Sequence, residues 1–384
     1  MRFRLRAVPP AGMNGMRIVR ISVFTFPVPF KVVFRHASAS RDRAENLIVA
    51  AYAEDDTVGY GEGCPRDYVT GETTASGLDF IRRHADSLIA DVADLAGLRA
   101  WIVHHVDDID RNPAAFCAVE TALLDLFGRV FGKCIEELVE IPRPATAFKY
   151  SAVLGNAPHF AYLWQLRRYR RRGFDDFKIK LSGDGRRDGR KLGALETAER
   201  VRLDANNLWT SSDDCVRHLT GLPGTVFAIE EPLKAGDLEG FRAVGEATDA
   251  RIVLDESLVR MEQLETLTDP DRWIVNIRVS KMGGILRSMA VARQASRLGI
   301  GIIVGCQVGE TSLLTRAAMP VMQAAGEDLL AAEGAFGTYL LGRDLTTPCL
   351  MFGHGGRLGP DQVPDGPGFG LTVAADQLMP LDEP

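Results

Sequence analysis

Four short apolar runs in the second half of the chain each end at one ionisable residue, and the spacing between those residues is nearly constant. The runs end at Asp204, Glu230, Asp255 and Lys281, which are 26, 25 and 26 residues apart. A step of about 25 residues is what one strand, one return helix and two loops use in a barrel of repeated β/α units. Because successive parallel strands open onto one face at their carboxyl ends, the four side chains are predicted to share one pocket.

Strand and helix patterns alternate over most of the second half of the chain. Strand-like apolar segments are separated by stretches whose apolar positions lie three and four apart, which indicates helices. We therefore predict an α/β fold, a (β/α)8-type TIM barrel, over residues 146–353. The predicted strands are 149–154, 176–181, 200–204, 225–230, 251–255, 274–280, 301–305 and 328–333, and four of the helices are 161–172, 187–198, 237–247 and 288–298.

The first part of the chain has a different order of elements. Extended patterns at 21–26, 46–52 and 58–60 come first, and helical periodicity follows over 74–140. Strands followed by helices indicate a separate α+β domain, which we place at residues 16–145. Residues 1–15 are predicted to be a disordered leader. The Gly/Pro-rich tail, residues 354–384, is predicted to pack on this first domain.

Composition excludes several classes of partner. The 384 residues carry a formal net charge of −6 and show no basic stripe of the kind that nucleic-acid binders use. No apolar run approaches the roughly 20 residues of a membrane helix. The six cysteines are scattered without close pairs, which favours a reduced cytoplasmic protein over a disulfide-bonded or zinc-binding one. We therefore expect a small-molecule partner and no nucleic acid or membrane.

The three acids at the strand ends are candidates for a metal site. Asp204, Glu230 and Asp255 would supply oxygen ligands from three adjacent strands, and hard oxygen donors without histidine or cysteine suit Mg²⁺ better than zinc. The alternative is that each acid caps the helix after its strand. Three acids in phase, followed by a fourth ionisable residue, favour the metal site.

Two lysines alternate along the second predicted strand. Side chains of a strand point alternately to its two faces, so Lys178 and Lys180 must point the same way, and in a barrel that way can be inward. Alternating lysines are also common on surface strands. Lys281, predicted on the sixth strand, would lie on the opposite wall. Two amines on opposite sides of a metal-bound carboxylate could move a proton at either face of the α-carbon.

The motifs around these residues resemble those of the enolase superfamily, in its muconate-lactonizing-enzyme subgroup. The resemblance extends over almost the whole chain, since residues 16 to about 140 are similar to that family's capping domain. The motifs are Lys178-x-Lys180, Asp204-Ala205-Asn206, Ile229-Glu230-Glu231-Pro232, Leu254-Asp255-Glu256-Ser257, Ser280-Lys281-Met282-Gly283-Gly284 and Tyr68-Val69-Thr70-Gly71-Glu72-Thr73.

The resemblance implies a role for each of these residues. Asp204, Glu230 and Asp255 would bind Mg²⁺, with Mn²⁺ as a possible substitute. Lys180 and Lys281 would be the two acid/base groups, and Lys178 would be the cation beside the substrate carboxylate. The residues expected to support the metal ligands are Asn206, Glu231 and Glu256.

Substrate selection is expected to depend on two loops of the capping domain and on the last two strand ends. An equal alternative for each residue is an ordinary solvated or helix-capping role. The eighth strand end at Glu333 lacks the Asp-x-Asp pair by which family dipeptide epimerases hold a substrate ammonium, which weakens an Ala-Glu epimerase assignment. The candidate substrate contacts are Arg35, His36, Arg66, Tyr68, Glu310 and Glu333.

The leading hypothesis is a Mg²⁺-dependent enzyme that abstracts the α-proton of a carboxylate substrate through an enediolate. Racemisation or epimerisation of an N-acyl amino acid or dipeptide is preferred, because two opposed lysines reach both faces. The alternative is a muconate-type cycloisomerase or an o-succinylbenzoate synthase-like syn-dehydratase, which needs one base. A third hypothesis is a catalytically inactive, ligand-binding barrel. A homo-oligomer is expected in each case.

Overall fold

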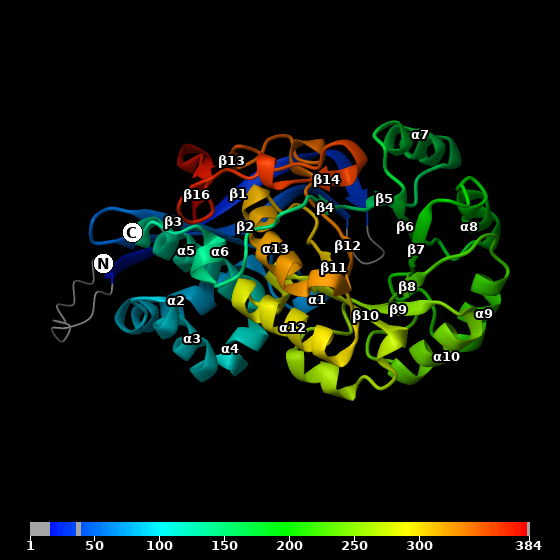
Figure 1. The fold of residues 1–384 in the computed structure, drawn as a ribbon, viewed down its shortest axis with the longest axis horizontal. Coiled ribbons are helices and arrows are strands. Elements are labelled where there is room, and N and C mark those ends of the chain that lie inside the picture. The colour runs from blue at the N-terminus through cyan, green and yellow to red at the C-terminus, as the bar shows by residue number, and fades with distance from the viewer. Residues whose placement is uncertain (1–15, 36–39, 382–384) are drawn as a thin grey trace.

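The computed structural model describes residues 16–35 and 40–381 and has two regions side by side (Figure 1). An antiparallel sheet and a group of helices, in blue and cyan, precede a barrel of strands in green, yellow and orange. The last strand, β16 (Met379–Pro380), returns to the first region and pairs with β1 (Ile18–Arg35). Within the described ranges, no helix is long and apolar enough to cross a membrane.

The first region is a four-stranded sheet, in the order β16-β1-β2-β3, covered by α5 (Pro113–Phe131). Three glycines of β3 let the helix backbone lie directly on the strand. A Cβ atom at Gly63, for example, would lie 1.9 Å from the carbonyl oxygen of Ala114. The other elements of this region are β2 (Ser40–Ala53), β3 (Val58–Gly63), α1 (Asp67–Thr70), α2 (Thr74–Asp91), α3 (Leu95–His104), α4 (Val106–Arg111) and α6 (Ile135–Leu138).

The second region is a barrel of eight parallel strands in sequential order. A bridge between Tyr150 and Ala332 joins the first strand segment to the last, and the Ser151 amide donates to the Ala332 carbonyl at 2.8 Å. The predicted TIM-type barrel with an N-terminal capping domain is confirmed. The strands are β5 (Ala152–Leu154), β6 (Asp176–Lys180), β7 (Arg200–Asp204), β8 (Ala228–Glu230), β9 (Arg251–Leu254), β10 (Trp273–Arg278), β11 (Gly301–Gly305) and β12 (Leu329–Ala332).

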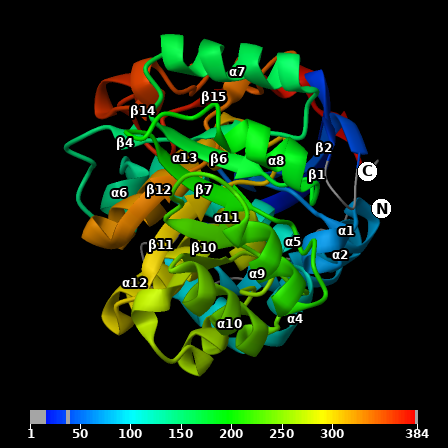
Figure 2. The ribbon, with the colours of Figure 1, turned by 90° about the vertical axis from the view of Figure 1, so that its right-hand side faces the viewer.

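Helices lie around the outside of the barrel, and Figure 2 shows α8, α9 and α10 over its strands. The predicted helix 187–198 is shorter in the structure, because α8 ends at Leu192 and turns follow. The helices are α7 (His159–Arg171), α8 (Gly185–Leu192), α9 (Ser212–Thr220), α10 (Leu238–Thr248), α11 (Val279–Met282), α12 (Ile285–Leu298) and α13 (Ser312–Ala325).

Short elements fill the remaining connections. Between β9 and β10 the return segment consists of two 3-10 helices, η1 and η2, instead of an α-helix. Further short strands and single 3-10 turns lie before the barrel and, for the most part, in the chain after β12. These elements are β4 (Phe148–Lys149), β13 (Thr346–Thr347), β14 (Arg357–Leu358), β15 (Thr372–Val373), η1 (Met261–Thr266), η2 (Pro270–Arg272), η3 (Gly326–Asp328), η4 (Gly337–Tyr339), η5 (His354–Gly356), η6 (Pro360–Gln362) and η7 (Ala375–Gln377).

Side chains fill the inside of the barrel in layers of different polarity. A small apolar cluster, which we call the floor layer, occupies one level and consists of Ala228, Val253, Ile274, Ile303 and Ala331. Two residues further along, three of these strands lead to a charged group: Glu230 follows Ala228, Asp255 follows Val253 and Glu333 follows Ala331. This alternation sets the direction of every side chain at the carboxyl ends of the strands.

Candidate active site

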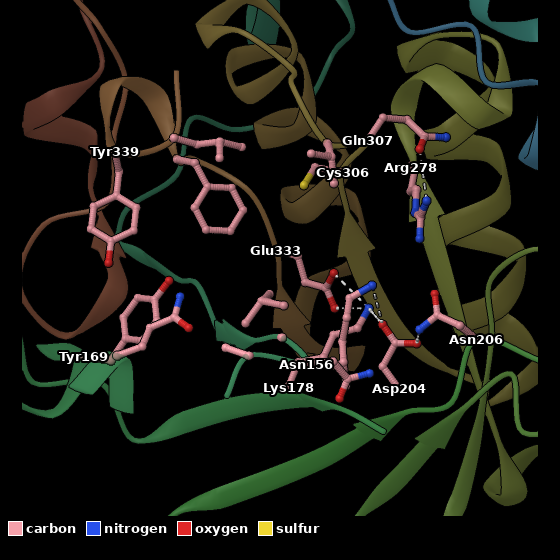
Figure 3. Close-up of a pocket in the computed structure, with 18 of the residues that line it drawn as sticks. Asn156, Tyr169, Lys178, Asp204, Asn206, Arg278, Cys306, Gln307, Glu333 and Tyr339 are labelled. Atoms are coloured by element: carbon pink, nitrogen blue, oxygen red, sulfur yellow. Dashed lines mark hydrogen bonds and ion pairs between the residues drawn. The ribbon is translucent and has the colours of Figure 1, made fainter. Parts of the chain in front are cut away.

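A cavity of about 640 Å³ opens at the carboxyl ends of the barrel strands. One end of it is charged and the other is aromatic: Figure 3 shows Lys178, Asp204 and Glu333 close together, with Tyr169 and Tyr339 well away from them. The polar lining consists mainly of Asn156, Lys178, Lys180, Asp204, Asn206, Arg278, Gln307 and Glu333. The apolar and aromatic lining includes Tyr68, Val153, Tyr169, Phe336, Tyr339 and Leu340.

Lys178 is the centre of the charged end. Its Nζ lies 2.7 Å from Glu230 Oε1, 3.3 Å from Asp204 Oδ2 and 3.2 Å from Glu333. Burial lowers the pKa of Lys178, but these three carboxylates outweigh that effect and raise it. Lys178 is therefore a permanent cation in the described structure.

Glu333, at the end of β12, is held by two cations. Arg202 Nη2 lies 2.5 Å from Glu333 Oε1, and Lys178 is the second partner. Although burial acts in the opposite direction, Lys178 and Arg202 lower the pKa of Glu333 to about 2. Arg202 also contacts Asp176 at 3.2 Å. Glu333 lines the cavity, as a carboxylate already engaged by protein groups.

Lys180 points into the cavity from the last position of β6. Its Nζ lies 3.5 Å from Asp204 Oδ2, and the two residues are paired in register on β6 and β7. Asn206 follows Asp204 and donates its side-chain amide to the Asp204 carboxylate. The structure thus brings Lys178, Lys180, Asp204, Asn206 and Glu333 to one end of the cavity.

Lys281 does not stand where we expected it. β10 ends at Arg278, and Lys281 belongs to the short helix α11. The predicted placement of Lys281 on the sixth strand is therefore wrong. Its side chain is fully buried and donates to Asp255 O at 2.6 Å, Asp255 Oδ1 at 2.9 Å and Asn276 O at 2.8 Å. Burial and the nearby Arg278 charge lower the pKa of Lys281 to about 7.

Arg278 takes the inward position at the end of β10. Its side chain lines the cavity, pairs with the Asp255 carboxylate and donates from Nη1 to Gln307 Oε1 at 3.0 Å. We did not single out Arg278 from the sequence. Strand alternation could have found it, since Ile274, Asn276 and Arg278 share one face and Ile274 belongs to the floor layer.

The three acids Asp204, Glu230 and Asp255 meet the requirements of an Mg²⁺ site in ligand type but not in their present arrangement. Glu230 Oε2 is buried and accepts no hydrogen bond, whereas the buried Asp255 Oδ2 is in an ion pair with Arg278. As the side chains stand in the described structure, no three acids, histidines or cysteines form a group that could hold one ion. Lys178 bridges Asp204 and Glu230, and Arg278 pairs with Asp255, so protein cations balance the carboxylates. The oxygen donors still fit Mg²⁺ by type.

Glu231 and Glu256 lie beside these acids. Glu231 accepts hydrogen bonds from the Asp255 amide at 2.7 Å and from the Ser257 amide at 2.8 Å, and so fixes the turn after β9. Burial raises the pKa of Glu231 to about 7. Burial and then the Glu231 charge raise the pKa of Glu256 to about 7 as well.

Of the other expected substrate contacts, Tyr68 lies at the cavity, whereas Arg66 and Glu310 lie elsewhere among protein groups. Tyr68 lines the cavity. Arg66 is fully buried and donates to the carbonyls of Pro65 and Val308. It therefore links the first region to the barrel by a hydrogen bond, and it is not among the described residues that line the cavity. Glu310 is a buried acid whose carboxylate accepts from the Gln307 amide at 2.6 Å, and burial raises its pKa to about 8.

The side chains of two expected substrate contacts, Arg35 and His36, fall outside the described residues. Arg35 is the last residue of β1, but its side chain falls outside the described residues. His36 lies outside the described residues altogether. Both stay predictions.

Comparison with known proteins identifies the family. The family described as "Enolase C-terminal domain-like" matches residues 161–377. An L-Lys-D/L-Arg epimerase of Methylococcus capsulatus is 30% identical over 368 residues, with 93% of this chain and 99% of that protein covered. An N-succinyl-L-Arg/Lys racemase of Bacillus cereus is 25% identical over 385 residues, with 95% and 98% covered.

A solved structure agrees with these relatives. A dipeptide epimerase from Enterococcus faecalis, in complex with Mg and the dipeptide L-Leu-L-Tyr, superposes with a TM-score of 0.79 at 25% identity and covers 93% of this chain and 100% of its own. The resemblance drawn from the sequence motifs is confirmed. The chain belongs to the enolase C-terminal domain-like family and is an enzyme of the enolase superfamily.

Proposed function

We propose that the protein abstracts the α-proton of a carboxylate substrate, with Lys180 as the base and with Asp204, Glu230 and Asp255 as ligands of Mg²⁺. The observation that carries the proposal is the position of Lys180, which faces the cavity from the end of β6 beside Asp204. Mn²⁺ is a possible substitute, because both ions accept carboxylate oxygen ligands. Mg²⁺ in the dipeptide epimerase neighbour supports the choice of metal.

The reaction needs charge stabilisation more than any other effect. Removal of the α-proton moves an electron pair onto the substrate carboxylate, which becomes an enediolate, and a divalent cation on those oxygens would stabilise it. Lys178 is a fixed positive charge at the same end of the cavity. Lys180 takes the proton on its amine nitrogen and later returns it. Asn206 orients Asp204 by donating to its carboxylate.

The substrate class we propose is an N-acyl amino acid or a dipeptide. The relative named as an N-succinyl-L-Arg/Lys racemase and the structural neighbour named as a dipeptide epimerase support this class. The cavity combines amide side chains, at Asn156, Gln165 and Gln307, with an aromatic end. Glu333 is already paired with Arg202 and Lys178, so it does not offer a spare carboxylate to a substrate ammonium. That favours an acylated nitrogen.

Two outcomes can follow from the shared proton abstraction. Racemisation or epimerisation is favoured by the activities in the names of the relatives. Cycloisomerisation or syn-elimination needs only one base, and is favoured by the burial of Lys281 away from the cavity lining. Each outcome begins with the same half-reaction, which is therefore the part to test first.

Solvent-deuterium uptake tests the half-reaction. N-succinyl amino acids, dipeptides and muconate are incubated in D₂O with and without Mg²⁺, and uptake is followed by mass spectrometry. We expect Mg²⁺-dependent uptake in at least one N-acyl substrate, and its loss in Lys180→Ala. The matched control is Lys234→Ala, an exposed lysine after β8. Uptake that persists in Lys180→Ala would contradict the assignment of the base.

We also propose a cytoplasmic homo-oligomer. All six cysteines of the chain are unpaired thiols in the structure, which is consistent with a reducing compartment. Light scattering of the purified protein gives the number of subunits. A monomer at micromolar concentration would contradict the oligomer.

A further inference from the structure

The two walls of the cavity at β6 and β10 carry different cations. In the ring of eight strands, β7, β8 and β9 separate β6 from β10 on one side, and β11, β12 and β5 separate them on the other. The two strands are therefore diametrically opposed. Lys180 is the last inward residue of β6, and Arg278 is the last inward residue of β10. Both line the cavity.

Lys281 is fully buried and is not among the described residues that line this cavity. Its three N–H groups match its three acceptors, two on Asp255 and one on Asn276. Its side chain is wholly buried, and it follows the strand as part of α11. Lys281 therefore positions Asp255.

Arg278 is equipped to bind an anion. A guanidinium offers five N–H donors, has no acceptor and keeps its proton in proteins. Its Nε is buried without a hydrogen-bond partner, while its other nitrogens contact Asp255 and Gln307. Figure 3 shows Arg278 beside Gln307 and across the site from Lys178.

We infer that the active site works on one face of its substrate, with Lys180 as the only proton-transfer group at the α-carbon and Arg278 as an anion-binding group on the opposite face. The inference rests on the proposed function. On the Lys180 face, the C–H bond breaks, an N–H bond forms on Lys180, and the electron pair moves to the carboxylate. The same ammonium then returns a proton to the same face, so configuration is retained.

Another group on the Arg278 side could in principle accept a proton. Cys306 also lines the cavity there. Burial raises the pKa of the Cys306 thiol well above its usual value, which keeps it protonated. The experiment includes Cys306→Ala for this reason.

The first measurement compares the two enantiomers of one substrate. N-succinyl-L-phenylalanine and N-succinyl-D-phenylalanine are incubated separately in D₂O with Mg²⁺, and deuterium uptake and optical purity are followed by mass spectrometry and chiral chromatography. We expect uptake at least 100-fold faster for one enantiomer, without loss of its optical purity. Arg278→Lys places an amine on the opposite wall, and should raise uptake by the slow enantiomer at least tenfold and cause racemisation.

Three results would overturn the inference. The first is a wild-type protein that exchanges both enantiomers within tenfold of each other and racemises them. The second is a Lys281→Met variant that loses exchange of one enantiomer while keeping the other, since a residue that positions Asp255 must affect both equally. The third is a Cys306→Ala variant that loses deuterium exchange of one enantiomer while keeping that of the other.

Binding gives a readout that does not depend on turnover. Calorimetry with N-succinylglycine and Mg²⁺ is compared for the wild type, Arg278→Met and the exposed-site control Lys234→Ala, with thermal unfolding as the test of folding. We expect at least tenfold weaker binding in Arg278→Met alone. Unchanged binding would refute the role of Arg278. Absence of exchange from every protein and probe would instead refute the proposed function, and the binding result would still decide the role of Arg278.

Discussion

The inside of the barrel has two levels that differ sharply, although the chain at the ends of β8, β9 and β12 contributes to both. The floor layer is apolar, whereas the level above it, which we call the charged layer, holds Lys178, Arg202, Glu230, Asp255 and Glu333. Only Leu254 separates Val253 in the floor layer from Asp255 in the charged layer. A strand period of two therefore places packing and chemistry next to each other on one face.

The two levels contribute to folding in opposite ways. Burial of apolar side chains in the floor layer stabilises the barrel by about 25 cal/mol per Å². Removal of paired charges from water costs several kcal/mol per ion and is only partly repaid by their attraction. Closely spaced buried charges of this kind are typical of functional sites. Substitutions in the two levels should separate activity from stability.

The largest expected effect is the loss of activity in Glu230→Gln. This substitution removes a negative charge from the proposed Mg²⁺ site, where Glu230 Oε2 accepts no hydrogen bond. We expect deuterium uptake to fall by about 100-fold or more and Mg²⁺ binding, measured by calorimetry, to weaken. The matched control is Glu120→Gln, the same change at a buried glutamate of α5. Equal losses in both variants would contradict the metal assignment.

Arg202→Met should show that one part of the charged layer is structural. Arg202 is fully buried and contacts Glu333, Asp176 and Ser151 Oγ. Its loss leaves the buried carboxylates of Glu333 and Asp176 each with one cationic partner fewer, so we expect the free energy of unfolding to fall by about 3 to 5 kcal/mol. Urea titration measures this. Arg200→Met, at a half-exposed residue that also contacts Asp176, should cost no more than about 1 kcal/mol.

Ile303→Ala tests the floor layer. Ile303 is fully buried and belongs to the apolar cluster inside the barrel. We expect a loss of about 2 to 4 kcal/mol in unfolding free energy, with deuterium uptake per folded molecule unchanged. Ile303→Val should cost about 0.5 to 1.5 kcal/mol. A strong loss of uptake at full folding would mean that the two levels are coupled.

The sequence predicted the barrel well, because its signals are repeated. Apolar runs recur at a constant step, and strand ends such as Asp204 and Glu230 fall at the predicted residues. The error at the sixth strand has a local cause. Val279 and Ser280 look like a continuation of β10, but the chain turns into α11, and Gly283 and Gly284 then adopt positive φ angles.

Contacts between distant segments could not be predicted from one sequence. Arg66, in a loop rich in polar residues, suggested a substrate contact. The structure buries it through a hydrogen bond to the carbonyl of Val308, 242 residues away. Lys281 likewise gains its partners at Asp255 and Asn276 from tertiary packing. Local patterns carry no information on such partners.

The smallest expected effect is a change in the pH dependence of stability at the boundary between the two regions. Glu120 of α5 accepts hydrogen bonds from the amides of Ile285 and Leu286, at the start of α12 in the barrel. Burial raises the pKa of Glu120 from 4.5 to about 7. Between those values the folded protein keeps a proton that the unfolded chain releases. The contribution of Glu120 to stability is therefore complete below pH 4.5 and is lost as pH rises through 7.

Glu120→Gln cannot ionise, so it should lack this part of the pH dependence. The difference in unfolding free energy, wild type minus variant, should fall by about 1 to 3 kcal/mol between about pH 5 and pH 8. Urea titrations of both proteins across that range measure the difference, and other buried acids cancel from it. A difference that stays constant with pH would show that Glu120 is ionised throughout. A pH-independent offset added to the expected fall would reflect the hydrogen bond that the amide cannot replace.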